Sequence, residues 1–273
     1  MNRKKMALLA MTGVMAGSLA IGGATYALFK STATNTMNTF ASGTLKMSAS
    51  RQDVPMTGPM FYTNDNVAAG MMGTGFWAPG DTHTRALFID NNGTLDGKLK
   101  SLKAVPEGNV SDAMEFAKQA TVTIAVFEAP ENTEYGTEVL QYLNKQQNDL
   151  FKERQTIWWN AIKARWTGLT IEQQKAAYYD FLAEIRTVLL DTIFEYKTTP
   201  FAVKQVFTGS LEELYNSNNG VSSALALKLG AGKTMFMGYT VHFMNLAPEV
   251  NNLVQGKEVK FTFQSDFVQS KNN

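Results

Sequence analysis

The chain has 273 residues, enough for one large domain or two small ones, and 44% of them are hydrophobic, which excludes a wholly disordered protein. Its 25 basic and 24 acidic residues nearly balance and form no long basic run, which argues against a nucleic-acid partner. The sequence has no cysteine, which excludes disulfides, a lipid-anchored cysteine, a thiolate metal site and a cysteine nucleophile.

Residues 1–27 have the pattern of a secretory signal peptide, with a basic start, an apolar stretch and small residues before a cleavage site. We predict cleavage between Ala27 and Leu28, and no stable membrane insertion of the chain after it. An uncleaved anchor is the alternative, because the apolar stretch is barely long enough to span a bilayer. The signal predicts a secreted protein of the extracellular matrix or the cell surface.

Residues 28–39 form a polar, threonine-rich arm with few side chains that can fill a core. One interpretation is a frayed terminus of the mature chain. The other is a detachable β-strand that completes the open sheet edge of another subunit, since threonine favours extended structure. The residues assigned to this candidate donor strand are Leu28, Phe29, Thr32, Thr34, Thr36 and Met37.

Residues 40–128 contain short alternating segments separated by turn residues, which is typical of β-structure. In the clearest segment Val122, Ile124 and Val126 face one way, and the residues between them face the other. We therefore expect the first part of a mainly β sandwich. The predicted strands span residues 44–49, 84–89, 95–105 and 120–127.

Residues 129–200 predict an inserted pair of long helices. Apolar positions recur at helical spacing from residue 137 to 166, and Gly168 is a plausible stop. Thr170 and Gln173 form a capping box that starts a second helix, which we expect to reach Lys197. The hairpin carries Trp158, Trp159 and Trp166, which either fill the seams of the hairpin or form an exposed patch for a partner.

Residues 201–273 return to β-structure and predict the second part of the sandwich. A strand over 201–208 leads into a short helix capped by Ser210. Strands over 235–245 and 259–267 follow, the last with phenylalanine at alternate positions. The fold class we predict is mainly β, a jelly-roll-type β-sandwich with a long α-helical hairpin inserted between two strands.

Several short motifs occur in an order that resembles one known family. They are Phe40-Ala41-Ser42-Gly43-Thr44-Leu45 after the signal, Pro79-Gly80-Asp81 before a strand that ends at Asn91-Asn92-Gly93, Ser210-Leu211-Glu212-Glu213-Leu214, and the phenylalanine-rich end. This arrangement is similar to the TasA/camelysin family of secreted bacterial matrix proteins. The resemblance covers residues 1–128 and about 201–268, and the helical hairpin departs from it.

The resemblance implies a secreted structural subunit that polymerises into biofilm-matrix fibres by donating its N-terminal strand to the next subunit. The expected partner is another copy of the chain in a head-to-tail filament, with an accessory matrix or cell-surface protein as a further candidate. A monomeric cell-surface adhesin is one alternative. The other is a secreted metalloendopeptidase, because camelysin-like relatives are classed as metalloproteases.

The sequence offers little support for an enzyme. Its two histidines, His83 and His242, fall on separate predicted strands, and neither belongs to the His-Glu-x-x-His motif of a zinc peptidase. No serine-nucleophile motif and no cofactor-binding fingerprint appears. We therefore assign no catalytic, metal-binding or cofactor-binding residue.

Overall fold

The structure is a computed structural model that describes residues 30–33, 45–50, 61, 76–128, 136–216 and 227–270. The described strands form two antiparallel sheets. The larger has the order β2 (Met47–Ser50), β3 (Thr82–Asn91), β9 (Thr234–Phe243), β5 (Ala120–Glu128), β7 (Thr199–Ser210) and β6 (Ile193–Tyr196). The smaller has the order β1 (Lys30–Ala33), β10 (Lys260–Gln269), β4 (Gly97–Glu107) and β8 (Lys228–Leu229).

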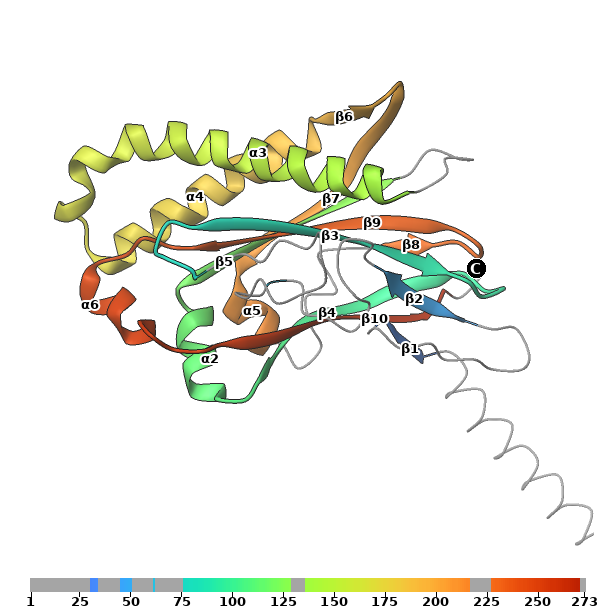
Figure 1. Ribbon diagram of the computed structural model, residues 1–273, viewed down its shortest axis with the longest axis horizontal. Coiled ribbons are helices and arrows are strands. Elements are labelled where there is room, and N and C mark those ends of the chain that lie inside the picture. The colour runs from blue at the N-terminus through green and yellow to red at the C-terminus, as the bar shows by residue number, and fades with distance from the viewer. Residues whose placement is uncertain are drawn as a thin grey trace, which may run out of the picture.

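A helical hairpin adds a third layer above the six-stranded sheet (Figure 1). It consists of α3 (Thr137–Ile162), a 3-10 turn η1 (Lys163–Gly168) and α4 (Ile171–Leu190). The four-stranded sheet lies on the opposite side (Figure 1). The remaining described helices are short, and they are α2 (Val110–Ala117), α5 (Leu211–Asn216), α6 (Pro248–Asn251) and the 3-10 turn η2 (Asn252–Val254).

Strand β5 explains why the layers stack in this order. Val122, Ile124 and Val126 lie in the core between the two sheets, as their spacing predicts. Ala125 and Phe127, which alternate with them, lie in a second core beneath α3 and α4. Because successive side chains of a strand point to opposite faces, a strand that is apolar on both faces needs a cover on both sides.

The second helix of the hairpin begins as predicted but ends earlier. The Thr170 hydroxyl accepts from the Gln173 amide nitrogen, and the Gln173 side chain accepts from the Thr170 amide nitrogen, which confirms the capping box. The predicted extension to Lys197 is wrong, since α4 ends at Leu190 and the chain turns at Lys197 with φ 53°. Strand β6 replaces the last helical turns because its pairing with β7 places the Phe194 ring 5.6 Å from that of Phe127.

Of two short helices, α5 was predicted and α2 was not. The Ser210 hydroxyl accepts from the Glu213 amide nitrogen and starts α5, as predicted. Helix α2 was not predicted, although Asn109 caps it by accepting from the Asp112 amide nitrogen. Sheets of six and four strands with a helical layer make the fold mixed α/β, and the predicted jelly-roll topology is not confirmed.

Candidate functional site

The N-terminal arm contributes an edge strand to the four-stranded sheet. Strand β1 pairs antiparallel with β10, and Thr32 stands opposite Asp266 in the register. β10 pairs through its other edge with β4 along its whole length, from Lys260 to Gln269. β1 therefore extends the sheet at the outer edge of β10, whose other edge is paired with β4.

The contact between the arm and β10 is short. β1 covers positions 265–268 of β10, and no described strand pairs with positions 260–264 on that edge. Of the predicted donor-strand and cleavage residues, Thr32 lies in β1. The others lie outside the described residues, and they are Ala27, Leu28, Phe29, Thr34, Thr36 and Met37.

The two histidines lie on the neighbouring strands β3 and β9 but on opposite faces of the six-stranded sheet. His242 stands opposite Thr82 in the register, and its Nδ1 lies 2.8 Å from the Thr82 hydroxyl oxygen. His83 is the next residue along β3, so its side chain leaves the sheet on the other face, where its ring stacks 4.7 Å from that of Trp77.

Burial lowers the pKa of both histidines. Complete burial lowers the pKa of His242 to about 4, against a weaker hydrogen-bonding effect of the Asp81 backbone that raises it. The pKa of His83 is also lowered, first by burial and in part by the charges of Lys152 and Arg85, while Asp81 opposes the shift. A lowered pKa favours the neutral imidazole, which is the form that binds a metal ion. The pKa shifts therefore do not exclude a metal site at these histidines.

The positions of the two histidines exclude a metal site that uses both of them as ligands. The sequence has two histidines and no cysteine, and the sheet itself separates the two imidazoles. Within the described ranges no three His, Asp or Glu side chains form a group that could hold a metal ion. The histidines therefore do not fit a zinc site with the His-His-carboxylate ligands of a zincin.

The three tryptophans of the hairpin gather where α3 turns into η1 and α4. Trp166 is buried, and its ring centroid lies 5.8 Å from that of Trp158 and 5.2 Å from that of Trp159. Its Nε1 donates to the backbone carbonyl of Asn245. The Trp158 ring packs on Tyr178, with 4.7 Å between centroids. These contacts fill the hairpin turn, and the half-buried Trp159 remains at its border.

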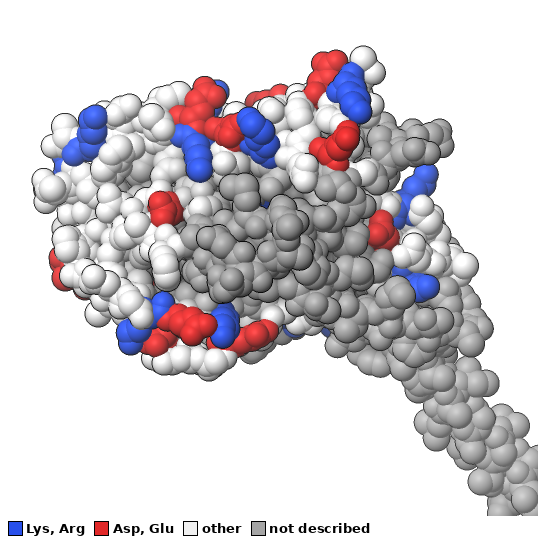
Figure 2. Space-filling view, viewed as in Figure 1, with Lys and Arg blue, Asp and Glu red and all other residues white. Residues whose placement is uncertain are grey.

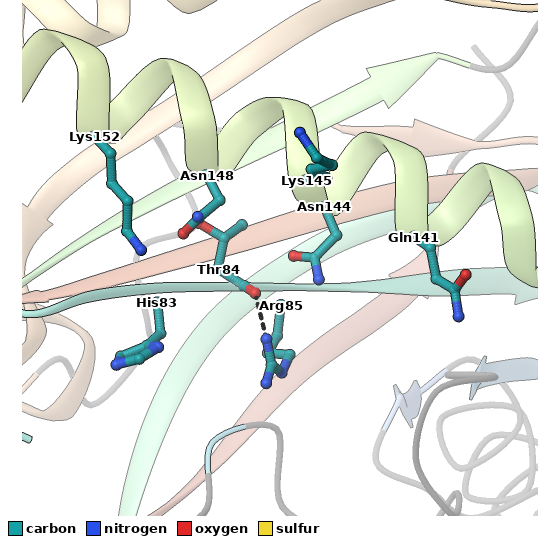
Figure 3. A pocket seen from close by; sticks show the side chains of 8 residues that line it. All are labelled: His83, Thr84, Arg85, Gln141, Asn144, Lys145, Asn148 and Lys152. Atoms are coloured by element: carbon teal, nitrogen blue, oxygen red, sulfur yellow. Dashed lines mark hydrogen bonds between the residues drawn. The ribbon is translucent and has the colours of Figure 1, made fainter. Parts of the chain in front are cut away.

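A groove between α3 and the start of β3 was not predicted from the sequence. It consists of two adjoining hollows of about 190 and 340 Å³ that share His83 and Lys152. Figure 3 shows how side chains of α3 reach down towards β3 along the smaller hollow. The sequence signal for this groove is the run of six polar residues 144–149. Within this run no apolar residue is available for the side of α3 that faces the sheet, which is unusual for a helix that packs on a sheet.

Charges of both signs are interspersed on the face shown in Figure 2, in keeping with the formal net charge of +1. None of the described helices is both long and apolar enough to cross a membrane.

A protein-family model described as camelysin metallo-endopeptidase matches residues 2–184, about two thirds of the chain. The match runs through α3 and into α4, where the sequence suggested a departure, and it stops before β7. No curated protein matches the chain.

Proposed function

The chain belongs to the camelysin family, and from that premise we propose that it is a secreted structural subunit that polymerises into extracellular biofilm-matrix fibres. The observation that carries the proposal is the arm strand β1, which adds to the outer edge of β10 through four residues. A terminal strand in this position can be exchanged for the same strand of a neighbouring subunit, because both would form identical backbone hydrogen bonds.

The register of β1 on β10 supports a longer contact in the fibre. Lys30 stands opposite Val268 and Ala33 opposite Ser265. A donated strand that continued this register would place Thr34 opposite Gln264 and Met37 opposite Phe261. Phe261 packs against the core between the sheets, so Met37 would meet an apolar neighbour.

Alternation along the donated strand fits such a sheet edge. Thr32, Thr34 and Thr36 would share one face, opposite Asp266 and other polar positions of β10. The odd-numbered residues would share the face that carries Phe267, which is buried between the sheets. Because donor and acceptor surfaces differ, the contact does not close on itself and produces a head-to-tail filament.

Secretion through the signal of residues 1–27 would deliver the subunit to the cell surface or the matrix. Cleavage after Ala27 would leave the arm at the new N-terminus, free to exchange. An accessory matrix or cell-surface protein that presents the first open edge would start the filament.

A disulfide placed across β1 and β10 tests the exchange. The chain lacks cysteine, and Ala33 and Ser265 are small and directly paired, so the double variant Ala33→Cys/Ser265→Cys brings two thiols within bridging distance. Oxidation of dilute monomer should lock the arm on its own subunit and abolish filaments in negative-stain electron microscopy. Reduction should restore them. Oxidation after assembly should give a covalent ladder on a denaturing gel.

The single variants Ala33→Cys and Ser265→Cys, treated identically, are the matched controls, and a chain that begins at Gly43 should remain monomeric. Filaments from the oxidised, locked monomer would rule out donation of the arm. Monomers under all conditions would favour the adhesin interpretation.

Peptidase activity is a second candidate because of the description of the family model. The opposed histidines argue against a two-histidine site, so a metal ion would need carboxylate ligands around a single histidine. Cleavage of casein that a chelator abolishes, and that is lost in only one of the single variants His83→Gln and His242→Gln, would establish a peptidase with a single-histidine metal site. Loss of cleavage in both single variants would contradict the geometric argument.

A further inference from the structure

The groove between α3 and β3 has the composition of a binding site rather than of a gap in the core. One of its walls is the flank of α3 beside the buried face of the helix, where groove-lining residues recur every three or four positions. These residues are Gln141, Asn144, Asn148, Lys152, Gln155 and Trp159. Residues at this spacing share one helix face, and at 1.5 Å per residue the wall from residue 141 to 159 is roughly 27 Å long.

The smaller hollow carries positive charge. Arg85 lines it from β3, and Lys145 and Lys152 line it from α3, while none of the described residues that line it is acidic. Figure 3 shows the Lys152 side chain directed towards β3. Lys145 is exposed and pairs with Asp149, one turn further along the helix and outside the lining. This local excess of one sign favours an anionic ligand.

Amide groups supply hydrogen-bonding capacity beside those charges. The Asn144 Oδ1 atom is buried and has no hydrogen-bond partner among the described residues. Figure 3 shows the Asn144 and Asn148 side chains directed from α3 towards β3, between the cationic groups. A buried amide oxygen without a partner is costly, and a ligand hydroxyl would satisfy it.

The larger hollow adds an aromatic surface. Trp159 lines it together with Gln155 and Thr156, and this tryptophan is only half-buried by its contacts with Trp158 and Trp166. Asp81 is the acidic member of the lining, and its Oδ2 already accepts from the Ala78 amide nitrogen at 2.6 Å. An indole face beside amides and hydroxyls presents an apolar platform next to hydrogen-bonding groups.

We propose that the groove between α3 and β3 binds an acidic polysaccharide, with lysine and arginine at its carboxylates, amides at its hydroxyls and Trp159 against a sugar ring. An acidic peptide would share the cations, but it would find few apolar positions for side chains. The site lies on the hairpin and β3, away from the β1–β10 edge, so it does not depend on filament formation. In a matrix protein it would join the protein to the surrounding glycan.

Calorimetric titration of the secreted chain with a hexameric oligogalacturonate tests the proposal. We expect saturable binding that weakens as salt is added, because the contacts are exposed ion pairs. Neutral maltohexaose should bind at least tenfold more weakly. The titration should give the same affinity for the oxidised Ala33→Cys/Ser265→Cys monomer, so a failure of strand exchange and a failure of glycan binding give different results.

Two variants should move the affinity in opposite directions. Lys145→Gln/Lys152→Gln removes two charges and should weaken binding about tenfold, as two exposed charge contacts would predict. Asp149→Asn removes the carboxylate that competes for Lys145 and should strengthen it. The matched control Lys98→Gln/Lys100→Gln makes the same change of charge at exposed positions of β4 and should leave the affinity unchanged.

Equal binding of maltohexaose would overturn the role of charge. Equal binding of a short polyglutamate would overturn the choice of a glycan in favour of an acidic peptide. Failure to bind oligogalacturonate, or an equal loss of affinity in the β4 control, would overturn the site.

Discussion

The six-stranded sheet presents two different surfaces to its two neighbours. Towards the four-stranded sheet it is apolar along β5 and β9, with Val122, Ile124 and Tyr239 among the buried residues. Towards the helical hairpin it changes along its length. One end carries a row of aromatic rings from Phe88, Phe236 and Phe127, which stand side by side in the register.

The opposite end of the hairpin-facing surface is polar although it is just as buried. Thr84, Thr240 and Thr123 form one row across β3, β9 and β5, and Thr82, His242 and Thr121 form the next. Gln147 of α3 reaches into the first row, where its Nε2 donates to the Gly238 carbonyl and the Thr240 hydroxyl. Apolar burial thus holds one end of the helix, whereas directional hydrogen bonds fix its position at the other.

Truncation at the aromatic end should have the largest effect on stability. Phe236 is fully buried, with its ring centroid 4.6 Å from that of Phe88 and 5.7 Å from that of Phe201. Phe236→Ala should lower the free energy of unfolding by about 3–5 kcal/mol in urea denaturation, because it leaves a cavity in a packed core. Phe76→Ala, at a side chain that is 92% exposed, should change it by less than about 0.5 kcal/mol. Similar losses for both variants would contradict the assignment of the core.

The alternation of β5 could be predicted from the sequence, because a single strand shows its own period of two. The residues of the aromatic and polar rows could be identified, but which of them stand side by side could not be predicted. Which histidine shares a face with which threonine depends on the register between β3 and β9, and the chain separates these strands by more than a hundred residues. The end of α4 was missed because it too depends on strand pairing. Ile193 and Tyr196 fit the apolar spacing of a helix, but in the structure they pair with β7 as part of β6.

Acid should act mainly on the polar end. His242 has a pKa of about 4 in the folded protein and 6.5 in the unfolded chain, so the unfolded chain binds more protons between these values. Stability should therefore fall as the pH decreases from about 6.5 to 4, by on the order of 3 kcal/mol from this residue. Urea denaturation of the chain and of His242→Gln at several pH values measures the difference.

The variant should lose most of the slope between pH 6.5 and 4.5. His83, whose pKa is lowered in the same direction, should leave a smaller residual slope in both proteins. Parallel pH profiles for the chain and the variant would show that His242 is solvated or already charged in the folded state.

The smallest of the three effects should appear where the aromatic and polar ends meet. A Cβ atom at Gly238 would lie 2.0 Å from the Gln147 Oε1 atom, so Gly238→Ala must displace a buried side chain that donates two hydrogen bonds. We expect a loss of about 1–3 kcal/mol in the free energy of unfolding, as for overpacked cores. Gln147→Ala should cost a similar amount, because it removes the hydrogen bonds that Nε2 donates to the Gly238 carbonyl and the Thr240 hydroxyl.

The double variant Gly238→Ala/Gln147→Ala distinguishes a steric conflict from two independent losses. Removal of the Gln147 amide creates room for the new methyl group, so the double variant should be no less stable than Gln147→Ala alone, and the coupling energy should be about 1 kcal/mol or more. Additive losses would mean that α3 already stands further from β9 at this row. The hydrogen bonds of Gln147 would then not be what positions the helix at its polar end.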